Sequence, residues 1–500
     1  MRARENTDLW SNKLIIRIGV PMIFKLGFKN TFVCLFCVLT ALISLDNVAA
    51  KSAFIGAKGF GSDTRAMYGN ERNPTICIVT NITNTNGTPK SELRNGIAVK
   101  TGSFKEMLNY NVDNKLIIFE VSGNIIIDER LYVRNNFVTI AGQTAPSPGV
   151  TFKGLTLVVR GHDILIQHIR IRVGDEGGVE PFVRDGLNIN AGDGQAPYNI
   201  VIDHCSISWA IDENMGIGGS GIHDVTVNNS IISEGLFDSL HPKGPHSKGM
   251  IVATVKNLSL IQNLFAHNHD RNPVLQSGNT VAVVNNLIYN PGDFNIRISA
   301  KEAASQLSIV GNETIAGSNT HHTARDNIPC IWGALYPGTQ LYISDNKSQR
   351  VNHQNPDDWS IVRDVSKMES LDNHKATNAP VWPSGLIARN SSKLKNYIVN
   401  NAGARPKDRD AVDERIVGDV VNFTGRIINS PGDVGGWPEL AKNTRNVATM
   451  MPKHSGPIPK NPHEDDDHDG YTNLEEWLHK LSAMVERTAP TGLKANSPTE

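Results

Sequence analysis

Two short stretches of the 500-residue chain carry the side chains best suited to chemistry. Residues 202–214 read IDHCSISWAIDEN and place His, Asp and Glu around a β-type run. Residues 267–273 read HNHDRNP and set Arg271 beside an aspartate at a strand-to-loop edge. An enzyme that eliminates across an acidic polysaccharide needs a cation to hold the sugar carboxylate and a base to take the neighbouring proton. The combination suggests that chemistry.

A repeated β pattern joins these stretches and predicts how they are positioned. In each repeat, alternating apolar residues precede polar residues and a small or Asn position, and the starts lie 23–36 residues apart. The repeats are FVTIAGQT from 137, ILIQHIRI from 164, IVIDHCSI from 200, VTVNNSII from 225, LSLIQNLF from 258, VAVVNNLI from 281, LSIVGNET from 307 and LYISDNKS from 341. Short strands at this period predict an all-β parallel β-helix with variable loops at one corner. A β-sandwich or propeller is the alternative, but it should show antiparallel hairpin signals.

Four asparagines fall at the same offset in consecutive repeats: Asn263, Asn286, Asn312 and Asn346. Asn tolerates left-handed backbone geometry, and its amide can bond to neighbouring backbone. Stacked repeats should therefore bring these side chains into an asparagine ladder, which a β-sandwich would not require.

Three carboxylates are candidates for a cation site. Asp185 lies one coil before Asp212 and Glu213, and equivalent positions on adjacent coils are about 5 Å apart. Oxygen ligands this close suit Ca²⁺, so the three residues could share one calcium ion. The alternative is that they are surface residues or loop caps.

Two basic residues follow on later coils of the same face. Lys248 leads into a strand and Arg271 precedes Pro273, which stiffens the chain. Facing a calcium cluster, they would hold a polyanionic sugar chain. Arg271 could instead form a structural salt bridge with Asp270 or Asp293. His204 looks catalytic by type, but its place in a β-strand favours a hydrogen-bonded structural role.

A separate acidic motif lies near the C-terminus. Residues 465–476 read DDDHDGYTNLEE and match the spacing of an EF-hand calcium loop, with Gly470 at the sharp turn. The predicted ligands are Asp465, Asp467, Asp469, Asn473 and Glu476. Pro459 and Pro462 precede the loop where a helix would be required, so we predict half an EF-hand with a structural calcium. An acidic solvated tail is the alternative.

The chain divides into five predicted segments. Residues 1–50 resemble a signal peptide, because Lys25 and Lys29 precede an apolar run over 31–45 that is too short for a typical membrane span. An uncleaved anchor is the alternative. Residues 51–350 form the β-helix, with a capping helix over 102–111, and 351–460 form loops packed on it. Residues 461–481 hold the calcium loop, and 482–500 are a disordered tail.

Composition excludes some partners. The formal net charge is −1, so nothing suggests a nucleic-acid binder. Two of the five cysteines lie in the predicted signal peptide, and the remaining three, Cys77, Cys205 and Cys330, are too few for a disulfide framework. A polygalacturonase-type hydrolase is disfavoured, because no convincing carboxylate pair flanks a cleft.

Several stretches together resemble the pectate lyase family, polysaccharide lyase family 1, in its secreted bacterial branch. They are FEVSGNI, TIAGQTAPSPGVTF, IQHIRIRVGDE, IDHCSISWAIDEN, HPKGPHSKGM, AHNHDRNP, VVNNLIYN and DGYTNLEEWL. The resemblance is strong over residues 51–300. It implies a right-handed parallel β-helix and calcium-dependent β-elimination on α-1,4-polygalacturonate, giving 4,5-unsaturated oligogalacturonates. A secreted monomer, free of the membrane after signal cleavage, is expected.

The resemblance also implies roles for individual residues. Arg271 matches the catalytic base, and Asp185 and Asp212 match calcium ligands, with Glu213 as a possible third. Lys248, His241 and Gln276 are assigned to substrate binding. The chain has Gly216 where the family often has a further Asp, and Gln276 where a second arginine often stands. These departures keep open a non-catalytic pectin-binding β-helix. The alternative enzyme is a lyase for another polyuronate, such as pectin or an alginate-like polymer.

Overall fold

The computed structural model describes residues 51–154, 156–176, 184–192, 194–332, 335–348, 358–364, 370–449, 451–453 and 455–487. The predicted signal peptide and residues 488–500 of the predicted tail lie outside this range. Among the described residues, none of the helices is long and apolar enough to cross a bilayer.

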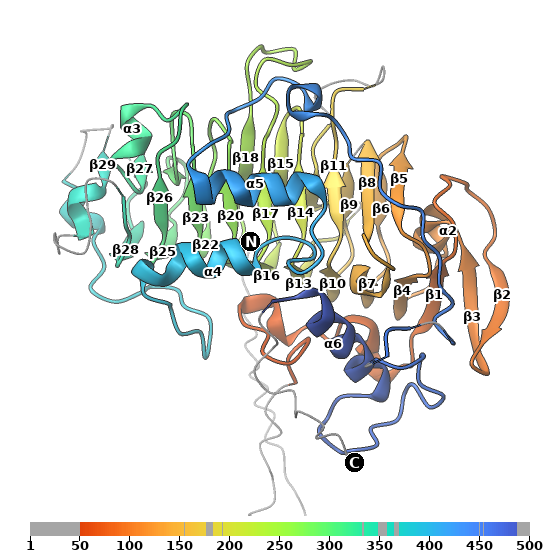
Figure 1. Cartoon of the computed structure of the whole chain (residues 1–500). Helices are drawn as coiled ribbons and strands as arrows, with labels where there is room; N and C mark the ends of the chain where they lie inside the picture. Colours follow the sequence, from red (N-terminus) through yellow and green to blue (C-terminus); the bar gives the residue numbers. More distant parts are fainter. Residues whose placement is uncertain are drawn as a thin grey trace, which may run out of the picture. The chain divides into compact units, whose positions relative to one another are not determined.

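Three sheets contain the described strands (Figure 1). In spatial order, the first consists of β2 (Lys90–Arg94), β3 (Ile97–Gly102), β1 (Thr75–Val79), β4 (Lys115–Phe119), β7 (Val138–Ala141), β10 (Ile164–Gln167), β13 (Tyr198–Asp203), β16 (His223–Asn228), β19 (Lys256–Ile261), β22 (Thr280–Val284), β25 (Gln306–Val310) and β28 (Gln340–Ser344). The second consists of β26 (Glu313–Ile315), β23 (Leu287–Tyr289), β20 (Leu264–Ala266), β17 (Ile231–Ser233), β14 (Ser206–Ser208), β11 (Arg170–Arg172), β8 (Val150–Gly154) and β5 (Gly123–Ile127). The third consists of β29 (Arg363–Asp364), β27 (Cys330–Ile331), β24 (Arg297–Ile298), β21 (Val274–Leu275), β18 (Lys248–Ala253), β15 (Glu213–Gly218), β12 (Leu187–Asn190), β9 (Leu157–Val159) and β6 (Leu131–Val133).

Successive coils contribute one strand to each sheet, and neighbouring coils pair in parallel. In the first sheet Ile164 pairs with Ile200, and Ile200 with Val225, so the inward apolar positions of each repeat lie above one another. These side chains fill one continuous core between the sheets. The predicted right-handed parallel β-helix is confirmed. The antiparallel pair of β2 and β3 lies at one edge of the first sheet.

The asparagine ladder forms as predicted at the corner between the first and second sheets. The amide nitrogen of Asn286 donates to Oδ1 of Asn312 at 3.0 Å, and that of Asn312 donates to Asn346 at 2.9 Å. Asn263 donates to Asn286 at 3.0 Å, so all four residues are connected. The left-handed position of the corner is one residue earlier, for example Asn285 at φ 56°. The ladder asparagines therefore supply hydrogen bonds, and the preceding residue makes the bend.

Replacing Asn286 by alanine is expected to destabilise the fold by about 2–4 kcal/mol. The change removes the acceptor of two Asn263 N–H groups and the donor to the Leu260 carbonyl, all of them buried. Chemical denaturation of the two proteins measures the difference. Asn109→Ala, at an exposed position in a helix end, should change stability by less than about 0.5 kcal/mol. Equal effects of both substitutions would contradict a structural ladder.

The described helices are short and lie outside the coils. They are α2 (Phe104–Asn109), α3 (His322–Arg325), α4 (Leu394–Asn401), α5 (Ala411–Asn422) and α6 (Asn473–Val485). The 3-10 helices are η1 (Phe60–Asp63), η2 (Ala66–Glu71), η3 (Gly142–Thr144), η5 (Asp358–Ile361), η6 (Leu371–His374), η7 (Ser391–Lys393) and η8 (Pro431–Val434). The predicted capping helix is α2, which begins with a capping box between Ser103 and Glu106.

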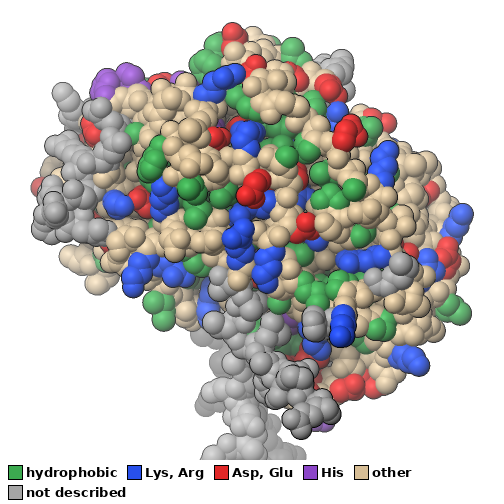
Figure 2. Space-filling model, viewed as in Figure 1, with side chains coloured by type: hydrophobic (Ala, Val, Ile, Leu, Met, Phe, Trp, Pro, Cys, Tyr) green, Lys and Arg blue, Asp and Glu red, His purple; other side chains and the backbone are tan. Residues whose placement is uncertain are grey.

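Residues 351–460 differ from the predicted run of loops, because α4 and α5 lie within them. The two helices cover the outer face of the second sheet (Figure 1) and bury Leu394, Ile398 and Ile416 against strand residues such as Ile231 and Leu264. In this view the outward surface carries Lys, Arg, Asp and Glu side chains among hydrophobic and uncharged ones (Figure 2). The helices form because apolar residues recur at helical spacing and need an apolar face to cover.

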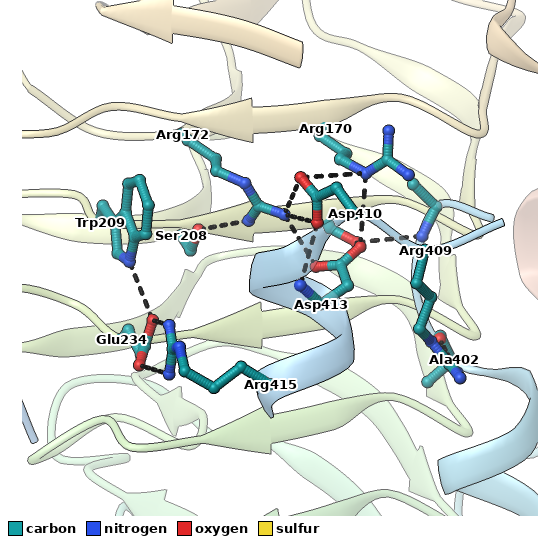
Figure 3. Close-up of polar contacts among 12 residues, drawn as sticks. Arg170, Arg172, Ser208, Trp209, Glu234, Ala402, Arg409, Asp410, Asp413 and Arg415 are labelled. Carbon is teal, nitrogen blue, oxygen red and sulfur yellow. Dashed lines mark hydrogen bonds and ion pairs between the residues drawn. The ribbon is translucent and has the colours of Figure 1, made fainter. Parts of the chain in front are cut away.

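Buried ion pairs attach α5 to the sheet (Figure 3). Arg172 of β11 donates to Asp410, the N-cap of α5, at 2.8 and 2.9 Å, and to Asp413 in its first turn at 3.0 Å. Arg415 of α5 forms a two-pronged pair with Glu234 at 2.7 and 2.8 Å. Surrounding carboxylates raise the pKa of Arg172 although burial acts against this, so the guanidinium stays charged.

Candidate active site

The three predicted calcium ligands meet at the start of neighbouring strands in the third sheet. Asp185 lies just before β12, and Asp212 and Glu213 lie at the start of β15, which pairs with β12. Each offers a carboxylate oxygen within 4.8 Å of the other two. The backbone N–H of Glu213 donates to the carboxylate of Asp185 at 3.3 Å, so this bond holds the Asp185 side chain beside the start of β15.

Burial raises the pKa of the Asp185 carboxyl to about 6, and repulsion from Asp212 acts in the same direction, against a hydrogen bond from Asn188. Nε2 of His246 lies 3.2 Å from Asp212 and that of His241 lies 3.6 Å away. Burial raises the pKa of Asp212, but these histidines outweigh it and the net pKa is lowered. Asp212 therefore ionises at a lower pH than Asp185.

The two predicted cations lie beside this cluster. Lys248 begins β18 and pairs in register with Glu213, and Arg271, at φ 63°, precedes β21 on the next coil. The Arg271 guanidinium forms an ion pair with Glu213. Its Nε–H is buried and has no hydrogen-bond partner among the described residues. Burial lowers the pKa of Arg271, and the charge of Arg297 lowers it further.

Asp270 accepts hydrogen bonds from the two neighbouring cationic side chains. It accepts from Arg297 at 2.7 Å and from Lys248 at 3.4 Å, and it takes the backbone N–H of Arg271 at 2.6 Å. The structural salt bridge considered for Arg271 thus involves Glu213 in place of Asp270 or Asp293. Because Arg297 occupies Asp270, the Arg271 guanidinium faces the carboxylate cluster.

The oxygen-rich donor set fits a calcium ion. Asp185, Asp212 and Glu213 provide carboxylate oxygens, which are the ligands of hard cations. Three carboxylates forced together, one of them with a raised pKa, are stabilised by a divalent cation between them. Glu213 also pairs with Arg271, so a bound cation and Arg271 would interact with the same carboxylate.

Relatives of the chain have been named for their activity. The protein named "Probable pectate lyase C" from Aspergillus flavus is 30% identical over 455 residues, covering 89% of this chain and 97% of that protein. The protein of the same name from Aspergillus fumigatus is 30% identical over 446 residues, covering 87% and 94%. The chain belongs to the pectate lyase family. It is accordingly a polysaccharide lyase.

These pectate lyase relatives are fungal, so the predicted bacterial branch finds no support. No family model matches the chain. Among solved structures, the cedar pollen allergen jun a 1 aligns with a TM-score of 0.47 at 17% identity, covering 69% of this chain and 92% of that one.

Gly216 and Gln276 are the two positions that depart from the pectate lyase pattern, and the structure shows what surrounds each of them. A Cβ atom on Gly216 would lie 2.5 Å from Oδ1 of Asn188, so Asn188 occupies the space beside this position. Asn188 also donates to Asp185 at 2.7 Å. Gln276 is exposed just after β21, and Arg297 supplies the second arginine near Arg271.

His241, predicted to bind substrate, lies beside Asp212. Its ring is buried and stacks on His246 at 3.5 Å, and Nδ1 accepts the Lys243 N–H at 3.1 Å. Nε2 lies 3.6 Å from Asp212, and the role of His241 in substrate binding stays a prediction. Sequence reasoning missed Asn188, His246 and Arg297, and it named Asp270 only as a possible salt-bridge partner of Arg271. Among the three missed residues, only His246 lies in a stretch quoted for the resemblance, HPKGPHSKGM.

The C-terminal acidic loop has the shape that its spacing predicts. Asp465, Asp467 and Asp469 bring carboxylate oxygens within 4.8 Å of one another, and Asp465 accepts the Gly470 N–H at 2.9 Å. Oδ1 of Asp465 is buried without a partner among the described residues. The predicted ligands Asn473 and Glu476 lie in the first turn of α6, which continues past the predicted boundary at 481 to Val485.

Substituting Asp185 by asparagine should stabilise the calcium-free protein while weakening calcium binding. Because the pKa of Asp185 is higher in the fold than its ordinary 3.8, ionisation destabilises the fold progressively from pH 3.8 to about 6. At pH 7 the gain should be up to about 3 kcal/mol, and it should shrink near pH 5. Melting temperatures in chelator and in calcium, at both pH values, measure this. An unchanged calcium-induced shift would exclude Asp185 as a ligand.

Proposed function

We propose that this lyase cleaves α-1,4-polygalacturonate by calcium-assisted β-elimination and releases 4,5-unsaturated oligogalacturonates. The observation that carries the proposal is the half-buried Arg271 beside three carboxylates and within one coil of Lys248. On one face of the third sheet, the carboxylates would hold a cation that binds the uronate carboxylate. Lys248 supplies a fixed positive charge beside them, and Arg271 is a group whose pKa is lowered.

Each residue then has a defined task. Ca²⁺ held by Asp185, Asp212 and Glu213 would neutralise the uronate carboxylate and acidify the neighbouring C–H. Lys248 binds the carboxylate and stabilises the charge that develops on the substrate. His246 and His241 keep Asp212 ionised and oriented. Gln276, exposed beyond β21, would contact a neighbouring sugar.

Arg271 is proposed as the base that removes the proton. An arginine is ordinarily too basic for this, with a pKa above about 12. Burial and the charge of Arg297 lower the pKa of Arg271, whereas the ion pair with Glu213 holds its proton in place. A cation bound beside Glu213 would weaken this ion pair, and Arg271 would have to lose its proton to solvent before it could accept the proton of the substrate.

We further propose that residues 1–50 direct secretion and that the loop at 465–476 holds a structural calcium. The first rests on Lys25 and Lys29 before the apolar run, with cleavage after Ala50. The second rests on the converging carboxylates and on the unpartnered oxygen of Asp465. In this scheme the enzyme works outside the cell as a monomer.

Asp465→Asn should remove one bound calcium and leave catalysis nearly unchanged, because the loop leads into α6 and is not part of the third sheet. Calcium per chain by equilibrium dialysis and kcat on polygalacturonate are the two readouts. A lower kcat at full calcium loading, or an unchanged calcium count, would contradict a structural calcium loop.

The reaction itself is tested with polygalacturonate in ¹⁸O-water. Elimination should give unsaturated ends, seen by ultraviolet absorbance, and products without ¹⁸O, and chelator should stop the reaction. Parallel reactions with methylated pectin and alginate show which polyuronate is the substrate. Products only from alginate would replace the substrate, and the absence of products from all three polymers would favour the non-catalytic pectin-binding β-helix.

A further inference from the structure

A second group of metal-binding side chains lies away from the third sheet. Asp203 ends β13, and His204 makes the following corner at φ 47°. His168 makes the same corner one coil earlier, at φ 58°. Glu486 joins them from the segment just after α6. His168 is 0% exposed and Asp203 is 1% exposed, while His204 and Glu486 are also buried.

The ligand atoms of these four residues all lie within 4.8 Å of one another. Nε2 of His168 is 3.2 Å from Oε1 of Glu486, and Nδ1 of His204 is 2.9 Å from Asp203 and 3.9 Å from Glu486. Ligands around a tetrahedral zinc are separated by about 3.3–3.6 Å, given bonds of about 2.0–2.2 Å. The observed spacing brackets that range.

His168 shows the clearest sign of a missing partner. Its Nδ1–H donates to the Ala404 carbonyl at 2.7 Å, which fixes the ring and turns Nε2 towards the cluster. Nε2 is buried and makes no hydrogen bond, because its approach to Glu486 lacks the required geometry. A bare imidazole nitrogen in this position is suited to a metal.

The neighbouring residues orient the carboxylate of Asp203. Gln167 donates to its Oδ2 at 3.0 Å, and Asn228 donates to its Oδ1 at 3.1 Å. Metal ligands in proteins are commonly held by such outer hydrogen bonds. Asp203 is therefore fixed from two adjacent coils before any ion binds.

We propose that His168, Asp203, His204 and Glu486 form a structural site for one Zn²⁺ ion. Two imidazoles and two carboxylates are a donor set that zinc accepts, whereas calcium prefers oxygen alone. The site is distinct from the carboxylate cluster on the third sheet and has no part in the proposed elimination.

The two carboxylates and two imidazoles are packed together in a buried group. A divalent ion would bind both carboxylates and the His168 nitrogen that makes no hydrogen bond.

The cavity beside the cluster and the position of Glu486 after α6 also agree with a structural ion. Asp203, His204 and Glu486 line a cavity of about 380 Å³, through which an ion can reach the cluster. His168 and His204 lie on adjacent coils, and Glu486 follows the helix that packs against the first sheet. The ion would therefore fasten the C-terminal helix to the β-helix.

Zinc binding by the full chain tests the proposal. Protein stripped with chelator is titrated with Zn²⁺ in excess Ca²⁺, which occupies the oxygen-only sites. We expect one tightly bound zinc and a rise in melting temperature of at least about 2 °C. Co²⁺ in place of zinc should give the strong visible absorption of a four-coordinate ion.

Three variants assign the ion. Glu486→Gln and His168→Gln should each lose this zinc, and Glu486→Gln keeps the carboxylate's shape if His168→Gln fails to fold. His246→Gln is the matched control, because it alters the other histidine–carboxylate group and should retain the zinc. Zinc that persists in Glu486→Gln, zinc lost only in His246→Gln, or no zinc in the native protein would overturn the proposal.

Discussion

Replacing Arg271 by alanine is expected to lower kcat on polygalacturonate by about 10²–10⁴-fold, with a small change in KM. The proposed base is removed, while Lys248 and the carboxylates that bind substrate and cation remain. The variant also releases Glu213 from its ion pair, so calcium affinity should stay the same or increase. Initial rates at several substrate and calcium concentrations separate these effects.

Two further variants sharpen this experiment. Arg271→Lys restores the charge without the guanidinium, and we expect it to remain inactive if position and pKa decide the chemistry. Arg363→Ala, at the far edge of the same sheet, should keep native activity. Activity of Arg271→Ala close to native, with calcium dependence intact, would assign the base to another residue.

Replacing Arg172 by methionine is expected to destabilise the protein by about 3–5 kcal/mol. The change leaves Asp410 and Asp413 buried with fewer counter-charges (Figure 3). Burial raises the pKa of Asp410, but Arg172 and Arg170 outweigh it and hold that pKa at about 2. The pairing therefore stabilises the fold above pH 3.8, and this contribution is lost as the pH falls towards 2.

Urea denaturation with far-ultraviolet circular dichroism measures the loss, and limited proteolysis shows whether α5 detaches first. Lys375→Ala breaks an exposed pair with Asp372 and should leave the urea midpoint nearly unchanged. Adding Asp413→Asn to Arg172→Met should recover part of the stability. If the double variant is as unstable as the sum of the single ones, the two side chains are not energetically coupled.

The sequence allowed the coils to be predicted because each repeat carries its own information. Alternating residues such as Ile200 and Ile202 specify an inward face, and Asn286 and its equivalents specify the corner. Helices α4 and α5 were not predicted, because their stability depends on the outer face of the second sheet. Nothing near Val412 or Ile416 in the chain indicates that this face lies opposite.

In the candidate site, too, the sequence predicts some of the residues and misses others. Asp185, Asp212 and Lys248 could be predicted because register places them on adjacent strands. The ion pair of Arg271 with Glu213 and the role of Asp270 depend on side-chain directions at left-handed corners, which the residue pattern does not encode. Arg297 enters from the next coil only through β24, a strand of two residues.

Calcium dependence of the elimination rate is the most direct test of the proposed site. Unsaturated product is followed by ultraviolet absorbance at saturating polygalacturonate while free Ca²⁺ is varied, for the native enzyme and for Asp212→Asn, with Asp372→Asn as control. We predict no product in chelator and a calcium requirement at least about tenfold higher in Asp212→Asn, equivalent to about 1.4 kcal/mol. Full activity of the native enzyme in chelator, or identical calcium curves for the native enzyme and Asp212→Asn, would contradict it.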